Sequence, residues 1–397
     1  MPKASTMNQR ILIIATFGMA LSFTIWAVFS PLANEFEVIY GLTATQKSIL
    51  VAVPVLLGSI MRIPFGILTD RYGGRKTFTA LLLFLTIPLI GAGFANSYYE
   101  LLFWGFFIGL AGTSFAISIT FVSKWTSPEK QGTALGINGM GNIGTAIAGF
   151  TIPTLTAFLG LQWGFWVLTI PVLIMAAFVW FGTPETPKKG PDKTIVGALS
   201  VLKHKDSWLL SILYFVTFGA FVAFGIYLPT LLMDLFDLTA VDAGMRAGGF
   251  VVLATLARPI GGILGDRIGA GKVLTYVFLF IAFGAFLMSV GLTNIYVMTV
   301  ACLLIALVTG AGNGAVFKLV PELFPNETGA VTGVVGAFGG LGGFFPPLLM
   351  GGLKDATGSY VIGIILLGIF SLICLMINKV NYDKKKPSAV FVKQFSK

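Results

Sequence analysis

Two arginines lie inside apolar segments of this 397-residue chain, where hydrocarbon is the expected solvent. Arg62 begins the stretch RIPFGILTDRYG and Arg258 begins RPIGGILGDRIG, so each arginine precedes an Asp-Arg pair by eight residues. A helix rises about 1.5 Å per residue, which puts each guanidinium about 12 Å from that polar loop, near the middle of a hydrocarbon layer about 30 Å thick. An arginine at that depth costs about 2.5–3.5 kcal/mol even on the lenient insertion scale, so both arginines require compensation.

The sequence offers no carboxylate at the depth of these arginines. All 16 Asp and Glu residues fall in loops or at the ends of apolar segments. A buried ion pair therefore lacks its acidic partner, while pairing with backbone carbonyls or with water in a cavity stays open. The functional interpretation is that the substrate is the counter-ion. Two guanidiniums related by an internal repeat and facing one cavity would bind a small anion, and their planar forks of donors suit an anion with several oxygens.

Small residues flank both arginines at helical spacing. Small side chains allow helices to approach closely, and we expect them also to leave room beside each guanidinium. The residues concerned are Gly58 and Gly66 around Arg62, and Ala254, Gly261 and Gly262 around Arg258.

The elements that must position these residues are membrane spans. The chain is 56% hydrophobic and 11% charged, with a mean hydropathy of +0.90, whereas a soluble domain carries about 25% charged residues. Twelve apolar stretches are each close to the length of about 20 residues that crosses a bilayer, and no cleavable signal peptide is evident. The twelve stretches are residues 11–33, 45–68, 77–95, 100–123, 132–158, 164–182, 208–232, 242–265, 273–291, 295–318, 329–353 and 359–378.

The net charge of +10 reflects membrane topology and not nucleic-acid binding. With the N-terminus in the cytoplasm, only Lys47, Arg246 and Lys354 among the 26 Lys and Arg residues fall in outer segments. This asymmetry follows the positive-inside rule. We therefore predict a multi-pass protein of the cytoplasmic membrane with both termini in the cytoplasm.

The chain reads as two copies of one unit. A polar stretch divides it into predicted six-span bundles at 1–183 and 207–378, with a cytoplasmic central loop at 184–206 and a basic cytoplasmic tail at 379–397. The arginine stretches repeat at an offset of 196 residues. Gly132, Gly136 and Gly139 recur as Gly329, Gly333 and Gly336 at an offset of 197. Duplicated halves with matching Gly-rich spans are typical of secondary transporters.

No pattern in the sequence supports an enzyme. There is no nucleophile–base set, no metal-ligand spacing and no phosphate-binding loop, so we expect no catalytic residue, metal or cofactor. Cys302 and Cys374 lie within spans and are interpreted as packing residues, and His204, the only histidine, as a surface residue of the central loop. The expected partners are a small inorganic anion and the lipid bilayer, with no nucleic acid, and a monomer is the expected state.

The loop GILTDRYGGRK, residues 66–76, resembles the signature of the major facilitator superfamily between spans two and three, and GGILGDRIGAGK, residues 261–272, resembles its degenerate copy. The resemblance covers the whole chain. It implies an all-α membrane protein with twelve transmembrane helices in two pseudo-symmetric six-helix bundles around a central cavity.

The two Asp-Arg loops are interpreted as gate latches. Asp70 and Asp266 sit at the predicted side on which spans eleven and five begin, and a carboxylate near a helix N-terminus is favoured by about 0.3–1 kcal/mol. The same loops also anchor charge on the cytoplasmic side. The predicted gating residues are Asp70, Arg71, Asp266, Arg267, Gly141, Gly144, Gly339 and Gly340.

Within the superfamily, four regions resemble the nitrate/nitrite porter family in order. GINGMGNIG and GVVGAFGGLGGF are similar to its two nitrate signatures, and RIPFG and RPIGG to its two arginine motifs. LYFVTFGAFVAFG resembles its aromatic span seven, and GAGNGAVF its span ten.

That resemblance implies a binding site for nitrate and nitrite. Arg62 and Arg258 would grip the anion and Asn142 would donate a hydrogen bond, while Tyr214, Phe218 and Phe115 would form the walls. One departure weakens the implied wall in span four, because Thr113-Ser114 stands where the family pattern has Gly-Asn. Asn138, one turn before Asn142 on the same helix face, and Asn313 complete the predicted set.

The predicted transport mode is exchange. Proton-coupled carriers commonly use an intramembrane Asp, Glu or His, and the predicted spans hold none near their middle. Exchange of nitrate for nitrite is therefore favoured. The alternatives are proton-coupled nitrate symport, exchange of another small anion such as a carboxylate, and a nitrate sensor without transport, for which the sequence shows no signalling domain.

Overall fold

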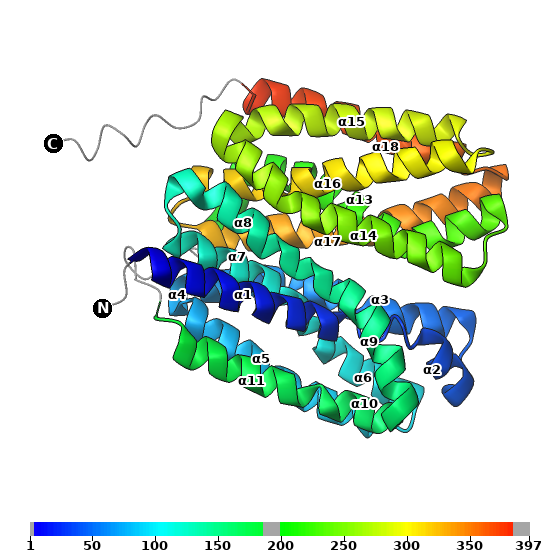
Figure 1. The fold of residues 1–397 in the computed structure, drawn as a ribbon, viewed down its shortest axis with the longest axis horizontal. Helices are drawn as coiled ribbons and strands as arrows, with labels where there is room; N and C mark the ends of the chain where they lie inside the picture. Colours follow the sequence, from blue (N-terminus) through cyan, green and yellow to red (C-terminus); the bar gives the residue numbers. More distant parts are fainter. Residues whose placement is uncertain (1–3, 186–198, 384–397) are drawn as a thin grey trace. The chain divides into compact units, whose positions relative to one another are not determined.

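The computed structural model describes residues 4–185 and 199–383, and these residues form helices joined by short turns, with no strand among them (Figure 1). The basic part of the tail from residue 384, and residues 186–198 of the predicted central loop, lie outside the described residues. Within these two described ranges, eleven helices or helix runs are long and apolar enough to cross a membrane. The expectation of an all-α membrane protein is therefore confirmed.

The twelve predicted spans correspond to single helices or to runs of helical segments. The first six are α1, α3 with α4, α5, α6 with α7, α8 with α9, and α10 with α11. Their bounds, with the short helix α2, are α1 Ala4–Trp26, α2 Ala33–Tyr40, α3 Ala44–Ile60, α4 Arg62–Tyr72, α5 Gly74–Gly93, α6 Tyr98–Ile108, α7 Ser114–Trp125, α8 Gln131–Gly139, α9 Gly144–Leu159, α10 Leu161–Val167 and α11 Thr169–Gly182.

The remaining six spans are single helices. They are α13 Lys205–Phe236, α14 Ala240–Leu264, α15 Ala270–Val290, α16 Ile295–Leu323, α17 Thr328–Thr357 and α18 Val361–Asn381. Only a π-helical turn, Gly265–Gly269, separates α14 from α15. The two therefore form one apolar run, Asp242–Val290, and this explains why eleven runs correspond to twelve predicted spans. Gly269 reverses the chain there with a φ of +93°, a conformation that suits glycine.

The described chain packs as two compact units whose members are not contiguous in sequence. Unit 1 comprises residues 4–126, 138–185, 199–207 and 324–341, and unit 2 comprises residues 127–137, 208–323 and 342–383. The first part of α17 therefore packs in unit 1, although it belongs to the second half of the sequence. The first part of α8 likewise packs in unit 2.

Within unit 1, α1 packs against α7, α9 and α11, and α5 packs against α11. Within unit 2, α16 packs against α14 and α15, and α15 packs against α18; Figure 1 shows these helices side by side. Several of the long spans are interrupted. The 3-10 segments Gly109–Thr113 and Met140–Ile143 break the spans of α6–α7 and α8–α9.

The break at Met61 places Arg62 at the first residue of α4. Pro64 has no N–H to donate to the carbonyl of Ile60 four residues earlier, so the helix is interrupted at this point. The new helix α4 therefore begins at Arg62, the buried arginine of this unit.

Glycines in this fold let helix backbones touch, as α9 illustrates. A methyl group added at Gly144 would collide with the backbone carbonyl of Ala20 in α1, and Thr24 donates a hydrogen bond to the carbonyl of Gly144 at 3.1 Å. Gly149 in the same helix has open space beside it.

We expect Gly144→Ala to destabilise the protein and Gly149→Ala to leave it unchanged or slightly more stable. Overpacking against a fixed backbone costs about 1–3 kcal/mol, whereas alanine is about 0.5–1 kcal/mol better than glycine in a helix interior that has room. The measurement is thermal unfolding of both variants in detergent. Equal melting temperatures for the two variants would contradict this account of α9.

Candidate functional site

The Arg62 side chain is fully buried in unit 1 and binds backbone carbonyls. Its Nε donates to the carbonyl of Gly112 at 3.1 Å, and its Nη1 donates to the carbonyl of Gly336 at 2.8 Å. The guanidinium carbon also lies 5.1 Å from the ring centre of Phe115 and 6.0 Å from that of Trp26. Carbonyl dipoles and ring faces are attractive partners for a cation, so these contacts stabilise the buried guanidinium of Arg62.

The room beside Arg62 comes from Gly336 and not from the two glycines in its own span. A methyl group added at Gly336 would lie 3.2 Å from Cδ of Arg62. Gly58 instead faces the Trp26 indole, and Gly66 faces the backbone of Gly329 in α17. These two glycines let helices approach, as expected, but neither leaves space for the guanidinium.

The Arg258 side chain is buried in unit 2, with 2% of its surface exposed. Its guanidinium carbon lies 5.3 Å from the ring centre of Phe218 and 5.2 Å from that of Phe221, both on α13. Nε and Nη2 have no hydrogen-bond partner among the described residues. Arg258 thus has an aromatic cradle and two donors free for a ligand.

The two predicted asparagines of span five are placed differently within unit 1. Asn138 forms a buried network, since its Nδ2 donates to Ser118 at 2.7 Å and to Thr16 at 3.3 Å. Asn142, 1% exposed, donates from Nδ2 to the carbonyl of Gly139 at 2.8 Å, and its Oδ1 has no partner in the described chain. Asn138 therefore ties helices together, whereas Asn142 retains hydrogen-bonding capacity. The binding roles of both remain predictions.

The three predicted wall aromatics are all buried. Tyr214 and Phe218 stack with ring centres 5.0 Å apart in unit 2, while Phe115 lies beside Arg62 in unit 1. Each therefore accompanies the predicted arginine of its own unit. Thr113 and Ser114, where the sequence departs from the family pattern, are also fully buried, and Thr113 donates back to the carbonyl of Leu110 at 2.7 Å.

The last predicted binding residue, Asn313, is buried in α16 at 1% exposure. Neither of its amide atoms has a hydrogen-bond partner within the described chain.

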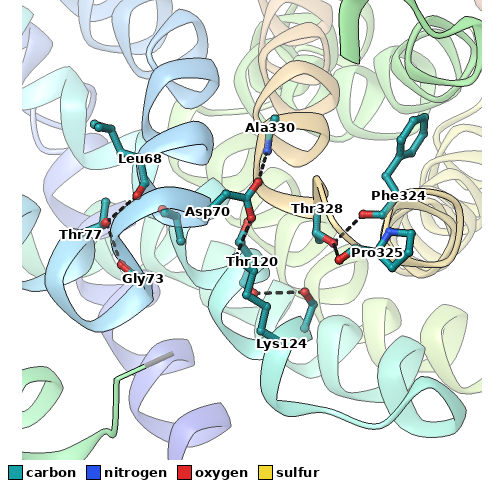
Figure 2. Close-up of polar contacts among 12 residues, drawn as sticks. Leu68, Asp70, Gly73, Thr77, Thr120, Lys124, Phe324, Pro325, Thr328 and Ala330 are labelled. Atoms are coloured by element: carbon teal, nitrogen blue, oxygen red, sulfur yellow. Dashed lines mark hydrogen bonds and ion pairs between the residues drawn. The ribbon is translucent and has the colours of Figure 1, made fainter. Parts of the chain in front are cut away.

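Asp70 holds the beginning of α17 within unit 1. Figure 2 shows its carboxylate between Lys124 and the start of that helix, with Oδ2 accepting from the amide of Ala330 at 2.9 Å and Oδ1 lying 2.8 Å from Nζ of Lys124. The first amides of a helix lack intrahelical acceptors, so a carboxylate satisfies one of them and interacts favourably with the helix dipole.

Asp266 makes the equivalent contact in unit 2, with the beginning of α8. It accepts from the amides of Gly132 at 2.9 Å and Thr133 at 2.7 Å, and from the Thr133 hydroxyl at 2.7 Å. Nζ of Lys318 lies 3.1 Å from its Oδ1. We call each set, Asp70 with Lys124 and Ala330, and Asp266 with Lys318 and Thr133, an aspartate clamp.

The other predicted gating residues have mixed surroundings. Arg71 lies over the ring of Tyr72 at 5.3 Å, and Arg267 is exposed. The glycines are buried: a methyl group at Gly141 would meet the flexible Met19 side chain, and one at Gly340 would meet the hydroxyl of Ser59. Gly339 is also buried. Their gating role remains a prediction.

A separate charged cluster joins three helix ends of unit 2. Asp234 in α13 pairs with Lys354 in α17, and the Tyr360 hydroxyl donates to Asp234 at 2.5 Å. The hydrogen bond from Lys354 lowers the pKa of Asp234, with the Tyr360 hydrogen bond as the next cause. Burial, followed by the interaction with Asp234, raises the pKa of Tyr360.

Sequence reasoning missed the lysines of both clamps. Lys124 and Lys318 come from α7 and α16, and each is more than 50 residues from its aspartate. The internal repeat could have identified these lysines, because the two lysines are separated by almost the same number of residues as the two aspartates. Trp26 and Phe221 were also missed as cation partners of the arginines, being two aromatics among many.

The chain is similar to known membrane transporters along most of its length. The model of the Major Facilitator Superfamily matches residues 12–347 and 210–395. A "Probable nitrate transporter NarT" of Staphylococcus epidermidis is 40% identical over 377 residues, covering 94% of this chain and 96% of the relative. A "Nitrite extrusion protein" of Bacillus subtilis is 38% identical over 366 residues, covering 90% of this chain and 91% of the relative.

Among solved structures, the human organic anion transporter MFSD10 (TETRAN) superposes with a TM-score of 0.77 at 15% identity. The match covers 94% of this chain and 99% of that protein. At this identity the likeness establishes the fold alone.

We expect Asp266→Asn to lower the thermal stability markedly. The side chains of Asp266 and Lys318 are only 9% and 12% exposed, and removing one partner of a buried pair costs about 3–5 kcal/mol. Asp242→Asn, in α14 of the same unit, is the matched control, because Asp242 pairs with Arg246 at the surface, where both side chains are about 40% exposed and a pair is worth about 0–1 kcal/mol.

The measurement is the melting temperature in detergent. The double variant Asp266→Asn with Lys318→Met should recover part of the loss, because no buried charge is then left without its partner. If Asp266→Asn and Asp242→Asn melt alike, the clamp does not stabilise unit 2.

Proposed function

Because the chain belongs to the nitrate/nitrite porter family of the major facilitator superfamily, we propose that it carries nitrate and nitrite across the membrane by alternating access, exchanging one anion for the other. The membrane proposed is the cytoplasmic membrane, with both termini in the cytoplasm. The family is one of transporters, so the protein is not an enzyme.

The single observation that carries this proposal is the burial of two guanidiniums, at 0% exposure for Arg62 and 2% for Arg258. The Arg258 guanidinium contacts ring faces, which carry no net charge, and its Nε and Nη2 have no hydrogen-bond partner among the described residues. We propose that a small anion is the counter-ion there. The planar guanidinium offers paired donors to two oxygens at once, a geometry that suits nitrate and nitrite.

We assign Asn142 as a further donor to the anion and Tyr214, Phe218 and Phe115 as walls. Asn142 lies within the 3-10 segment Met140–Ile143, and its Nδ2 has two N–H donors, of which the bond to the carbonyl of Gly139 uses one. Aromatic walls of this kind would exclude water, and a lower dielectric strengthens the interactions of charges. Asn138 is the weakest of the predicted ligands, because its amide already bonds to Ser118 and Thr16.

We assign the two aspartate clamps to gating, together with the predicted residues Arg71, Arg267, Gly141, Gly144, Gly339 and Gly340. Asp266 binds two amides at the start of the span that contains GINGMGNIG, and Asp70 binds one amide at the start of the span that contains GVVGAFGGLGGF. A clamp of this kind is stable when formed and breaks without disturbing the helix itself, as a gate requires.

The same charge distribution favours exchange as the transport mode. A carrier that closes around net positive charge without an anion leaves that charge in a low dielectric, at a cost of several kcal/mol. Nitrate uptake against an inside-negative potential also needs coupling, at about 2.3 kcal/mol per 100 mV for one charge. Exchange for nitrite meets both requirements. Proton symport is the alternative that meets the second.

We expect Arg62→Lys and Arg258→Lys each to weaken nitrate binding by at least tenfold without preventing membrane insertion. Lysine keeps the charge but loses the planar pair of donors. Binding is measured as the nitrate-dependent rise in melting temperature, with chloride as the reference anion. Arg246→Lys, at the exposed surface of α14, is the control and should bind nitrate normally. Normal binding by either buried-arginine variant would refute the planar clamp.

We expect internal nitrite to accelerate uptake of labelled nitrate severalfold. Proteoliposomes loaded with nitrite are compared with empty ones that carry an inward proton gradient, and initial uptake is measured. In the empty vesicles the gradient alone should drive little uptake. If the proton gradient drives concentrative uptake in the empty vesicles, and nitrite loading does not increase uptake, the protein is a proton symporter. That result would leave the proposed arginine site intact.

A further inference from the structure

Asn313 presents a buried side-chain amide. It lies in α16 of unit 2, is 1% exposed, and neither Oδ1 nor Nδ2 has a hydrogen-bond partner within the described residues. Buried polar groups are normally paired, because an unmade hydrogen bond leaves the full desolvation penalty. Asn138, which the sequence also singles out, shows the usual case, with Ser118 bonding to both of its amide atoms.

Two glycines fix the position of Asn313 against neighbouring helices. A methyl group added at Gly312 would lie 2.7 Å from Cγ2 of Thr217 in α13, and one added at Gly314 would meet the backbone carbonyl of Arg258 in α14. The segment of α16 that carries Asn313 is therefore packed tightly against both helices that form the Arg258 cradle.

A chain of ring contacts places Asn313 at the level of that cradle. Phe317, one turn along α16 on the same face as Asn313, meets Tyr214 edge-on at 4.7 Å. Since Phe317 lies beside Tyr214 and Gly312 beside Thr217, the numbering of α16 falls as that of α13 rises. Asn313 is thus level with Thr217 and Phe218, and Phe218 is the ring beneath the Arg258 guanidinium.

Thr217 adds a second unsatisfied group at the same level. It is fully buried, and its hydroxyl has no partner in the described chain. Thr309, one turn before Asn313 in α16, shows the usual alternative, because its hydroxyl donates to the carbonyl of Ile305 at 2.7 Å. Thr255, one turn before Arg258, resembles Thr217 in having an unsatisfied buried hydroxyl.

We propose that Asn313 and Thr217 form a polar subsite beside Arg258 that binds the third oxygen of nitrate, and that Asn313 thereby determines the preference for nitrate over nitrite. This inference rests on the proposed function. Nitrate is planar with three oxygens, and the guanidinium fork binds two of them. The third oxygen accepts from Nδ2 of Asn313 and the Thr217 hydroxyl. Nitrite has only two oxygens and makes no use of these donors.

The hydrogen-bonding chemistry of the subsite predicts which anion loses affinity when the Asn313 amide is removed. A site built to hydrogen-bond one group of a substrate discriminates against an analogue that lacks the group, because its own polar atoms then stay unpaired. Removing the Asn313 amide should therefore weaken nitrate binding and leave nitrite binding nearly unchanged.

The test compares nitrate and nitrite dissociation constants in detergent, obtained from the ligand-dependent rise in melting temperature of the full chain. We expect Asn313→Ala to weaken nitrate about tenfold and nitrite less than threefold. Thr217→Val, which replaces only the hydroxyl by a methyl group, should shift the ratio of the nitrate to the nitrite dissociation constant about threefold. Thr309→Val is the matched control and should leave the ratio unchanged, because the Thr309 hydroxyl bonds to its own helix.

Each outcome decides a separate claim. If the unmodified protein binds both anions and Asn313→Ala weakens both equally or neither, the subsite is refuted while the anion-binding function stands. If the unmodified protein binds neither anion, the proposed function itself fails and the subsite fails with it. If Asn313→Ala does not fold, the ratio for Thr217→Val decides: a shift supports the subsite, and an unchanged ratio refutes it.

Discussion

A charged guanidinium in the interior of a membrane protein must be compensated, and much of the local structure around Arg62 and Arg258 follows from that constraint. Around Arg62 the compensation comes from the carbonyls of Gly112 and Gly336 and from two aromatic rings. The 3-10 segment Gly109–Thr113 and the glycines of α17 bring those carbonyls within reach. Around Arg258 two aromatic rings of α13 provide the compensation, and Nε and Nη2 have no hydrogen-bond partner among the described residues. These contacts compensate the buried charge within each unit.

The two aspartate clamps apply one physical device twice. Each joins a carboxylate, a lysine from a distant helix and the first amides of a Gly-rich helix, and each lies wholly within one packing unit. The second copy is the fuller one, with two amides and a hydroxyl on one carboxylate. In both clamps the carboxylate binds amides near a helix N-terminus, where intrahelical acceptors are lacking and the helix dipole favours negative charge.

Several glycines of this protein allow neighbouring helices to approach closely, and fewer of them border open space. At Gly66, Gly144 and Gly261 an added methyl group would strike the backbone of a neighbouring helix, whereas Gly149, Gly244 and Gly249 have nothing near them. Helices that touch backbone to backbone hold their polar side chains at fixed levels. That is how α16 sets the level of Asn313 next to the Arg258 cradle.

The sequence alone determined the membrane class, the twelve spans, the duplication and the family, because hydropathy, charge asymmetry and repeated motifs are all written along one dimension. It also identified Arg62, Arg258, Asp70 and Asp266, since charges are rare at the depths and spacings where these residues stand. Only the tertiary structure decided which groups meet them. Lys124, Lys318 and Gly336 come from helices distant in sequence, and Asn138 differs from Asn142 only in its neighbours. Hydrogen-bond partners depend on helix packing, and packing between distant segments leaves no local pattern in a single sequence.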